Sequence, residues 1–200
     1  MSINQAGRRQ LRHALRSRRN QLAPTARRSA TRDALRRLQR LSEFRRAHRI
    51  GLYHAHRGEL DPAALVALEH QRFYVPVLRG KALRFAPLGH ARGGRNRFGI
   101  AEPLATRSLR PAALDLVITP LVGFDEYGTR LGAGGGFYDR SFALRNRGRN
   151  RPLSVGLAFA CQQVEALSCQ PWDVPLDCIV TERGVIRPLQ SPRREAATQE

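Results

Sequence analysis

The sequence predicts an α/β fold: one three-layer, Rossmann-like domain with a mainly parallel sheet, helices on both faces and a helical extension at its N-terminus. Three observations support this prediction. Residues 4–47 carry apolar side chains at helical spacing. Short apolar runs of strand length then recur between residues 50 and 181. One of these runs, at residues 114–120, is apolar nearly throughout, which is typical of a buried central strand.

Length and composition favour a single soluble domain. The 200 residues suffice for one well-buried core and are few for two, so we assign residues 1–188 to one domain and residues 189–200 to a disordered polar tail. No apolar run approaches the roughly 18–20 residues that span a membrane. The three cysteines fit neither a metal-binding spacing nor a complete disulfide framework. We therefore expect a monomer in the cytoplasm, although the Arg-rich, acid-poor N-terminus also resembles a mitochondrial presequence.

The chain is strongly basic, with a formal net charge of +19. Of its 35 basic residues only Lys81 is a lysine. Residues 1–50 contain 15 arginines but only two acidic residues, Asp33 and Glu43. Such a charge attracts polyanions, which include RNA, nucleotides and acidic small molecules. The charge alone does not distinguish among these three.

The N-terminal half is expected to contain two helices followed by a strand–helix–strand unit. The helices occupy residues 4–20 and, after a break at Pro24, a stretch that ends near Ala47. A short strand follows at residues 50–53. Asp61 then has the features of a helix N-cap with proline at the first helical position, and it is expected to start another helix.

The C-terminal half is expected to add strands around a glycine-rich loop. Residues 89–98 are rich in glycine and arginine and are expected to form a mobile loop, and residues 163–167 a short helical turn. The remaining elements are strands and one helix, which follows the glycine-rich loop. The expected strands cover residues 73–77, 82–86, 114–120, 153–159 and 178–181, and the helix extends to about Leu144.

The glycine-rich stretch at residues 128–140, here called the glycine segment, is the strongest candidate site. Five glycines fall within nine residues, with Arg130 and Arg140 beside them and Asp139 near the end. Glycines allow successive backbone N–H groups to converge on an anion, and a following helix adds its positive N-terminal end. The segment matches neither the P-loop nor the dinucleotide-binding pattern, so it predicts a phosphate site of another kind. The alternative is an ordinary flexible turn.

Several segments together resemble the 5-formyltetrahydrofolate cyclo-ligase family, also called methenyltetrahydrofolate synthetases. The glycine segment is similar nearly throughout to the family's G-x-R-L-G-x-G-G-G-[YF]-Y-D-R stretch. Four further segments resemble family motifs in the same order, and they are residues 8–12, 58–61, 98–103 and 173–177. Five ordered segments are far more specific than any one of them.

The resemblance implies that 5-formyltetrahydrofolate and ATP with Mg²⁺ give 5,10-methenyltetrahydrofolate, ADP and phosphate. It assigns catalytic roles to Arg130 and Tyr138, and it makes Asp139 and Asp177 the metal ligands, with Asp173 as the alternative to Asp177. The residues that it assigns to ATP binding are Arg8, Arg9, Gln10, Leu11, Arg12, Arg130, Leu131, Gly132, Ala133, Gly134, Gly135, Gly136, Phe137 and Tyr138.

Arg8 and Arg12 lie four residues apart on one helix face, which suits contact with nucleotide phosphates, while a solvated basic face is the alternative. Arg8 stands where the family usually has lysine, so the charge is kept and the donor geometry differs. For the folate, the resemblance assigns His54 and Glu59. A carboxylate stabilised by a helix N-terminus is the alternative for Glu59.

Two other functions remain open at this point. One is a basic module that binds RNA or nucleotides without catalysis, and the other is a divergent paralogue that acts on a different N-formyl or acidic substrate. The sequence has no RRM, KH or interleaved aromatic pattern, so we expect no specific nucleic-acid partner. We also expect no membrane association. The partners are therefore the folate substrate and ATP.

Overall fold

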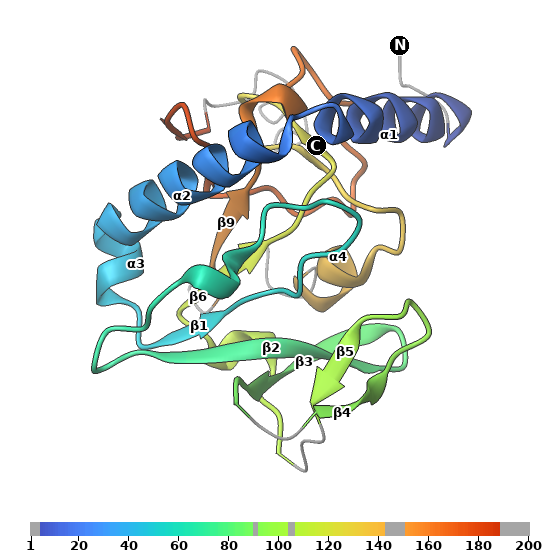
Figure 1. The fold of residues 1–200 in the computed structure, drawn as a ribbon. Helices are drawn as coiled ribbons and strands as arrows, with labels where there is room; N and C mark the ends of the chain where they lie inside the picture. Colours follow the sequence, from blue (N-terminus) through green and yellow to red (C-terminus); the bar gives the residue numbers. More distant parts are fainter. Residues whose placement is uncertain (1–4, 90–91, 104–106, 143–150, 189–200) are drawn as a thin grey trace, which may run out of the picture.

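The computed structural model describes residues 5–89, 92–103, 107–142 and 151–188, and a twisted seven-stranded sheet forms its centre (Figure 1). The five inner strands are parallel, whereas the two edge strands pair antiparallel to their neighbours. In spatial order the strands are β11 (Val185–Ile186), β10 (Cys178–Val180), β9 (Leu153–Leu157), β6 (Leu116–Thr119), β1 (Arg49–Gly51), β2 (Arg72–Arg79) and β3 (Ala82–Pro87). The predicted α/β fold with a mainly parallel sheet is confirmed.

Helices and short two-stranded sheets surround this sheet. The helices are α1 (Gln5–Asn20), α2 (Pro24–Arg40), α3 (Ser42–Arg46) and α4 (Phe137–Phe142), and the 3-10 turns are η1 (Pro62–Ala64), η2 (Pro111–Ala113) and η4 (Ala160–Gln162). The small sheets pair β4 (Arg92–Arg95) with β5 (Ala101–Pro103), and β7 (Gly123–Phe124) with β8 (Arg130–Leu131). No helix in the described part of the chain is both long and apolar enough to cross a membrane.

The alternation of side chains along β6 separates the two faces of the sheet. Leu116 and Ile118 point into one core, which α2 and α3 cover through residues such as Leu38. Val117 points to the opposite face, where Phe142 of α4 packs. All four residues of β6 are buried, which is why the sequence of this strand is apolar without alternation.

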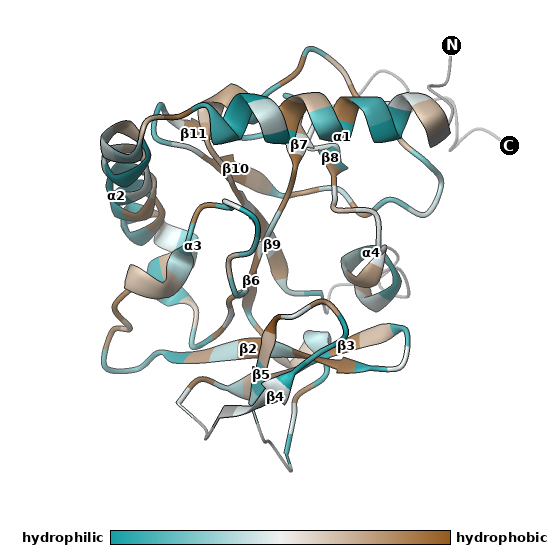
Figure 2. Ribbon diagram, turned by 45° about the vertical axis from the view of Figure 1, so that its right-hand side comes forward, coloured by the Kyte–Doolittle hydropathy of each residue, from teal (hydrophilic) through white to brown (hydrophobic). Residues whose placement is uncertain are grey.

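Helix α1 lies across the carboxyl ends of the parallel strands. It contacts η4, which follows β9 at that end of the sheet, and the views in Figures 1 and 2 agree with this placement. Leu15 of α1 is fully buried against Val122 and Leu131, and this burial contributes about 1.5–3 kcal/mol. The N-terminal helix is therefore packed onto the domain, directly above the glycine segment.

Four local predictions were wrong. Asp61 caps a turn as expected, since its Oδ1 accepts from the Ala63 N–H at 2.9 Å, but η1 ends at Ala64 and the backbone becomes extended. Leu65 is buried there but Val66 and Leu68 remain exposed, so little of the apolar surface that stabilises a helix is packed. The expected loop at residues 89–98 contains β4, and the turn expected at residues 163–167 lies earlier, as η4. The second helix ends at Arg40, where Leu41 is extended before α3 begins. The predicted tail at residues 189–200 lies outside the described residues.

Candidate active site

The glycine segment begins at the turn of a β-hairpin that a buried carboxylate shapes. Asp125, between β7 and β8, accepts hydrogen bonds from Tyr127 N and Thr129 N through Oδ1, and from Leu167 N through Oδ2. Gly128 in this turn has φ +77, a conformation that favours glycine. Sequence reasoning missed Asp125, although an aspartate three residues before a glycine is a recognisable turn signal.

The glycines beyond β8 shape an open backbone surface. Gly134 has φ +109 and Gly136 has φ +62, both in the left-handed region. A Cβ atom at Gly134 would contact the guanidinium group of Arg12 at 3.8–4.0 Å, so this loop and α1 are close neighbours. The arrangement places the glycine-rich backbone next to an arginine. Backbone N–H groups together with a nearby cation are what an anion site requires.

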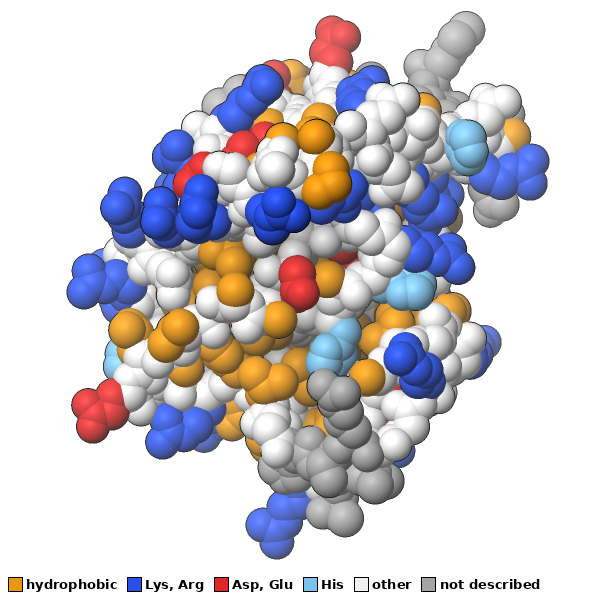
Figure 3. Space-filling view, in the orientation of Figure 1, with side chains coloured by type: hydrophobic (Ala, Val, Ile, Leu, Met, Phe, Trp, Pro, Cys, Tyr) orange, Lys and Arg blue, Asp and Glu red, His pale blue; other side chains and the backbone are white. Residues whose placement is uncertain are grey.

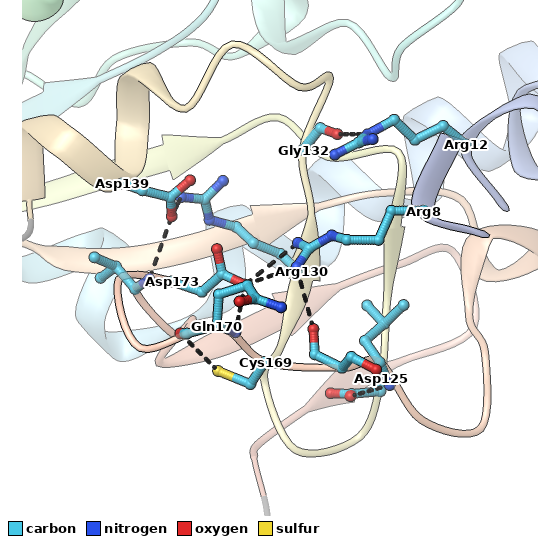
Figure 4. Close-up of polar contacts among 12 residues, drawn as sticks. Arg8, Arg12, Asp125, Arg130, Gly132, Asp139, Cys169, Gln170 and Asp173 are labelled. Atoms are coloured by element: carbon cyan, nitrogen blue, oxygen red, sulfur yellow. Dashed lines mark hydrogen bonds and ion pairs between the residues drawn. The ribbon is translucent and has the colours of Figure 1, made fainter. Parts of the chain in front are cut away.

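Arginines from one face of α1 line the glycine segment (Figure 4). Arg12 Nε donates to the Gly132 carbonyl at 2.9 Å, and Arg16 Nη2 lies 3.5 Å from the Ala133 carbonyl. Desolvation by burial, followed by repulsion from Arg8 and Arg16, lowers the pKa of Arg12. Such mutual repulsion among half-buried cations favours the binding of an anion between them.

Arg8 is held one turn earlier on the same face. It forms an ion pair with Asp173 at 3.3 Å, and its Nη1 donates to the Ser168 carbonyl at 3.3 Å. Asp173 Oδ2 also accepts from Gln170 N at 3.0 Å. Asp173, the residue that the sequence left as an alternative metal ligand, therefore serves as the counter-ion of Arg8.

The five predicted residues 8–12 do not all face the site. Arg8 and Arg12 are half-buried, and Leu11 packs with Leu15 and Leu131, whereas Arg9 and Gln10 are exposed. Figure 3 shows other basic side chains of α1 and α2 on the molecular surface. The alternative of a solvated basic face therefore describes part of α1, and the inner row of arginines belongs to the candidate site.

Arg130 and Asp139 join the two ends of the glycine segment. Their ion pair measures 2.5 Å, and the side chains are 5% and 17% exposed. Asp139 Oδ1 also accepts from Val174 N at 3.2 Å. The residue predicted to contact phosphate, Arg130, and the residue predicted to bind the metal, Asp139, are thus neighbours of opposite charge.

Tyr138 lies beside this pair and carries an unusual hydroxyl group. The Arg130 guanidinium lies 5.8 Å from its ring centroid, and the ring stacks on Phe142. The hydroxyl oxygen is buried and has no hydrogen-bond partner among the described residues. Burial, followed by the negative charge of Glu59, raises the pKa of Tyr138 well above its ordinary value. A buried hydroxyl without a partner costs free energy unless a ligand supplies one.

Asp177, the second predicted metal ligand, has other contacts. It precedes β10, and both its carboxylate oxygens accept from Arg151, one of them at 2.6 Å from Nη1. Oδ2 also accepts from Ser154 N at 2.7 Å, at the amino end of β9. The described residues contain no group of three or more histidine, cysteine or acidic side chains that could hold a metal ion. The metal-binding role of Asp177 stays a prediction.

The predicted folate residues follow β1 at the carboxyl edge of the sheet. His54 is half-buried three residues after this strand. Glu59 Oε2 accepts from His56 N at 3.1 Å, which orients the carboxylate within its own turn. Burial, the largest effect, raises the pKa of Glu59, while His56 N–H and the charges of Arg19 and Arg16 lower it.

The two predicted halves of the site face each other. Burial, followed by the charge of Glu59, raises the pKa of Tyr53, which follows β1, and also that of Tyr138 on α4. Its carboxylate therefore lies near both, although these residues are far apart in sequence. Arg16 and Arg19 complete the charged surroundings, and sequence reasoning missed both. They continue the spacing of Arg8 and Arg12 along one helix face, which is the signal that identifies them.

Comparisons with known proteins agree with one another. The chain matches the family model described as the 5-formyltetrahydrofolate cyclo-ligase family over residues 4–182. It is 38% identical to the 5-formyltetrahydrofolate cyclo-ligase of Haemophilus influenzae over 87% of this chain and 97% of the relative. Identity to the enzyme of the same name from Escherichia coli K12 is also 38%, over 86% and 98% of the two chains.

Solved structures give the same result. The chain is similar to the NMR structure of Aquifex aeolicus 5,10-methenyltetrahydrofolate synthetase, with a TM-score of 0.76 and 31% identity over 90% of this chain and 92% of the other. Similarity to the 5,10-methenyltetrahydrofolate synthetase of Mycoplasma pneumoniae has a TM-score of 0.66, with 22% identity over 88% of this chain and 98% of the other. This second likeness supports the fold alone.

Proposed function

Because the chain belongs to the 5-formyltetrahydrofolate cyclo-ligase family, we propose that it converts 5-formyltetrahydrofolate to 5,10-methenyltetrahydrofolate, with consumption of ATP and with Mg²⁺ as the metal. The family resemblance predicted from the five ordered motifs is confirmed, and the chain is accordingly a ligase. The residues that carry out the reaction are part of the proposal.

The chemistry requires the formyl oxygen to become a leaving group. The oxygen accepts the γ-phosphoryl group as ADP departs, N10 then attacks the formyl carbon, and the C–O bond breaks with release of phosphate. N10 loses its proton as the ring closes. The protein has to neutralise phosphate charge and align the two substrates, as in other phosphoryl transfers.

The single observation that carries the ATP half of the proposal is the meeting of the α1 arginines with the glycine segment. Arg12 already lies against Gly132 and Gly134, and Arg8 lies one turn away. Phosphate oxygens are stronger acceptors than the Gly132 carbonyl that Arg12 contacts, because each bond would join opposite charges. Arg130 would add a further positive charge at the other end of the segment.

The donor set at the end of the segment fits Mg²⁺ through one carboxylate. Magnesium is usually held by one or two carboxylates together with phosphate oxygens and water, and Asp139 supplies such a group next to Arg130. When bound, the ion would neutralise charge on the nucleotide phosphates. Asp177 remains the predicted second ligand, and the contacts of its carboxylate with Arg151 compete with that role.

The folate half of the proposal rests on Glu59, His54 and Tyr138. We assign Glu59 to the N–H donors of the pterin ring, because a half-buried carboxylate that already has an oriented oxygen is a suitable acceptor. His54 would line the same space. The buried hydroxyl of Tyr138 is available as a donor to the reacting groups.

The test is a turnover assay with purified protein, 5-formyltetrahydrofolate and Mg-ATP, which follows the absorbance of the methenyl product. We expect ATP-dependent product formation, with ADP and phosphate in equal amounts. No product at micromolar enzyme would refute the proposal. Salt-dependent binding of RNA without saturable folate binding would then favour the basic binding module. Size-exclusion chromatography tests the expectation of a monomer.

A further inference from the structure

Arg19, in the last turn of α1, is a buried cation whose hydrogen-bonding groups are only partly used. Its side chain is 1% exposed, and Nη2 donates to the Arg57 carbonyl at 2.6 Å. Nε and Nη1 are buried and have no hydrogen-bond partner among the described residues. A buried charge in this state is costly, and apolar side chains of similar volume often replace such groups without loss of stability. Fold stability alone therefore gives no reason for an arginine here.

The charge of Arg19 acts on Glu59. Desolvation is the largest effect on the pKa of Arg19 and lowers it, while Glu59 is the strongest charge that raises it. Conversely, Arg19 is the strongest charge that lowers the pKa of Glu59 against the effect of burial. The ion pairs within 4.0 Å in the described part of the chain do not include these two residues, so the attraction acts over a longer distance.

The same side chain also holds the turn that carries Glu59. Arg57 is left-handed, with φ +51, a conformation that a non-glycine residue keeps only when its surroundings fix it. Arg19 binds the carbonyl of Arg57, and Arg27 of α2 binds the next carbonyl, that of Gly58, at 2.8 Å. Two arginines from two helices thus fix consecutive peptide groups immediately before Glu59.

We propose that Arg19 is a positioning residue for Glu59. Arg19 holds the turn 57–59 and keeps the Glu59 carboxylate ionised, so that the carboxylate can accept hydrogen bonds from the pterin ring. The inference rests on the proposed function of Glu59 as a folate contact. A protonated carboxyl group would present a donor to the N–H groups of the ring and would lose part of this recognition.

Other charged and titratable groups also face Glu59. Arg16 lies on the same helix as Arg19, Tyr53 follows β1, and Tyr138 belongs to α4. The turn itself contributes the backbone N–H of His56, and Arg27 contacts the turn from α2. The charge of Arg27 is not among the influences on the pKa of Glu59, which makes this residue a matched control.

The test compares Arg19→Met, Arg19→Lys and Arg27→Met by the pH dependence of kcat/KM for the folate, which reports groups of the free enzyme. Methionine removes the charge but keeps much of the side-chain volume, so Arg19→Met should move the acid limb upward by about one pH unit, a tenfold loss of activity on that limb. Arg19→Lys should restore most of the acid limb, because lysine keeps the charge.

Arg27→Met loses two carbonyl contacts, to Gly58 and to Arg19, but no charge named among the influences on the pKa of Glu59, so its acid limb should stay in place. Equal shifts for Arg19→Met and Arg27→Met, or no shift for either, would overturn the proposal. A carbon-13 NMR titration of the glutamate carboxyls, assigned with Glu59→Gln, provides a readout that needs no turnover. An unchanged pKa of Glu59 in Arg19→Met refutes the role of Arg19, whereas an inactive wild type with a shifted pKa refutes only the proposed reaction.

Discussion

Arg130 and Asp139, nine residues apart in sequence, form a 2.5 Å ion pair that closes the glycine segment on itself. Each is the counter-ion of the other. Both are largely buried, so either one would be left uncompensated if its partner were removed. Under the proposed function Arg130 would contact phosphate and Asp139 would bind the metal ion, and the first prediction tests the second assignment.

Asp139→Asn should lower kcat by at least about 100-fold, because the amide cannot supply the negative charge that a metal ion requires. Loss of the counter-ion of Arg130 should also reduce stability, by about 3–5 kcal/mol. Turnover as a function of Mg²⁺ concentration checks the first effect, and denaturant unfolding checks the second.

A second variant, Asp177→Asn, distinguishes the two possible roles of that residue. If Asp177 mainly anchors Arg151 and Ser154 N, this variant should lose stability and keep its dependence on Mg²⁺. If Asp177 is the second metal ligand, the Mg²⁺ requirement should rise. Full activity of Asp139→Asn would contradict the metal role of Asp139.

Arg12→Gln should raise the KM for ATP by about 10- to 100-fold, since a charge-assisted hydrogen bond contributes roughly 1.5–3 kcal/mol. Arg9→Gln is the control, because it removes the same charge from an exposed neighbour on the same helix. Steady-state kinetics with varied ATP distinguish the two. Equal effects would mean that the overall positive field, rather than the inner face of α1, governs binding.

Tyr138→Phe should lower kcat by about 10- to 100-fold if the hydroxyl group contacts the reacting groups. Its thermal stability should not fall, since the buried hydroxyl oxygen has no hydrogen-bond partner among the described residues. Single-turnover kinetics and a thermal melt provide both measurements. Unchanged kinetics would leave Tyr138 as a packing residue against Phe142.

Glu59→Gln should weaken folate binding and stabilise the fold at neutral pH. Burial raises the pKa of Glu59 in the folded state above 4.5, its ordinary value. The carboxyl group therefore ionises at lower pH in the unfolded chain than in the folded protein. The resulting loss of folding stability is absent below pH 4.5, grows as the pH rises toward the pKa of the folded state, and is complete above that pKa.

The melting temperature of Glu59→Gln relative to wild type should therefore increase between pH 4 and pH 8. Calorimetry at these two pH values measures the difference, with the exposed Glu69→Gln as control. A difference that does not change with pH would contradict the argument.

The sequence by itself determined the elements with strong local signals. The apolar run at β6 predicted a central strand, and all four side chains of this strand are buried. The helical period of α1, the glycines with positive φ and the order of the motifs were equally readable, since each depends on residues close together in the chain. The helix expected after Asp61 did not form although its cap was correct, because Leu65 alone is buried whereas Val66 and Leu68 remain exposed.

The tertiary structure decided which charged groups meet. Asp173 became the partner of Arg8, and Asp177 became the partner of Arg151. Arg19 of α1 was brought beneath the turn that carries Glu59. Such pairs join residues up to 165 positions apart, and no local pattern encodes them. Electrostatic interactions depend on distance and burial, which only the folded arrangement of α1 over the sheet supplies.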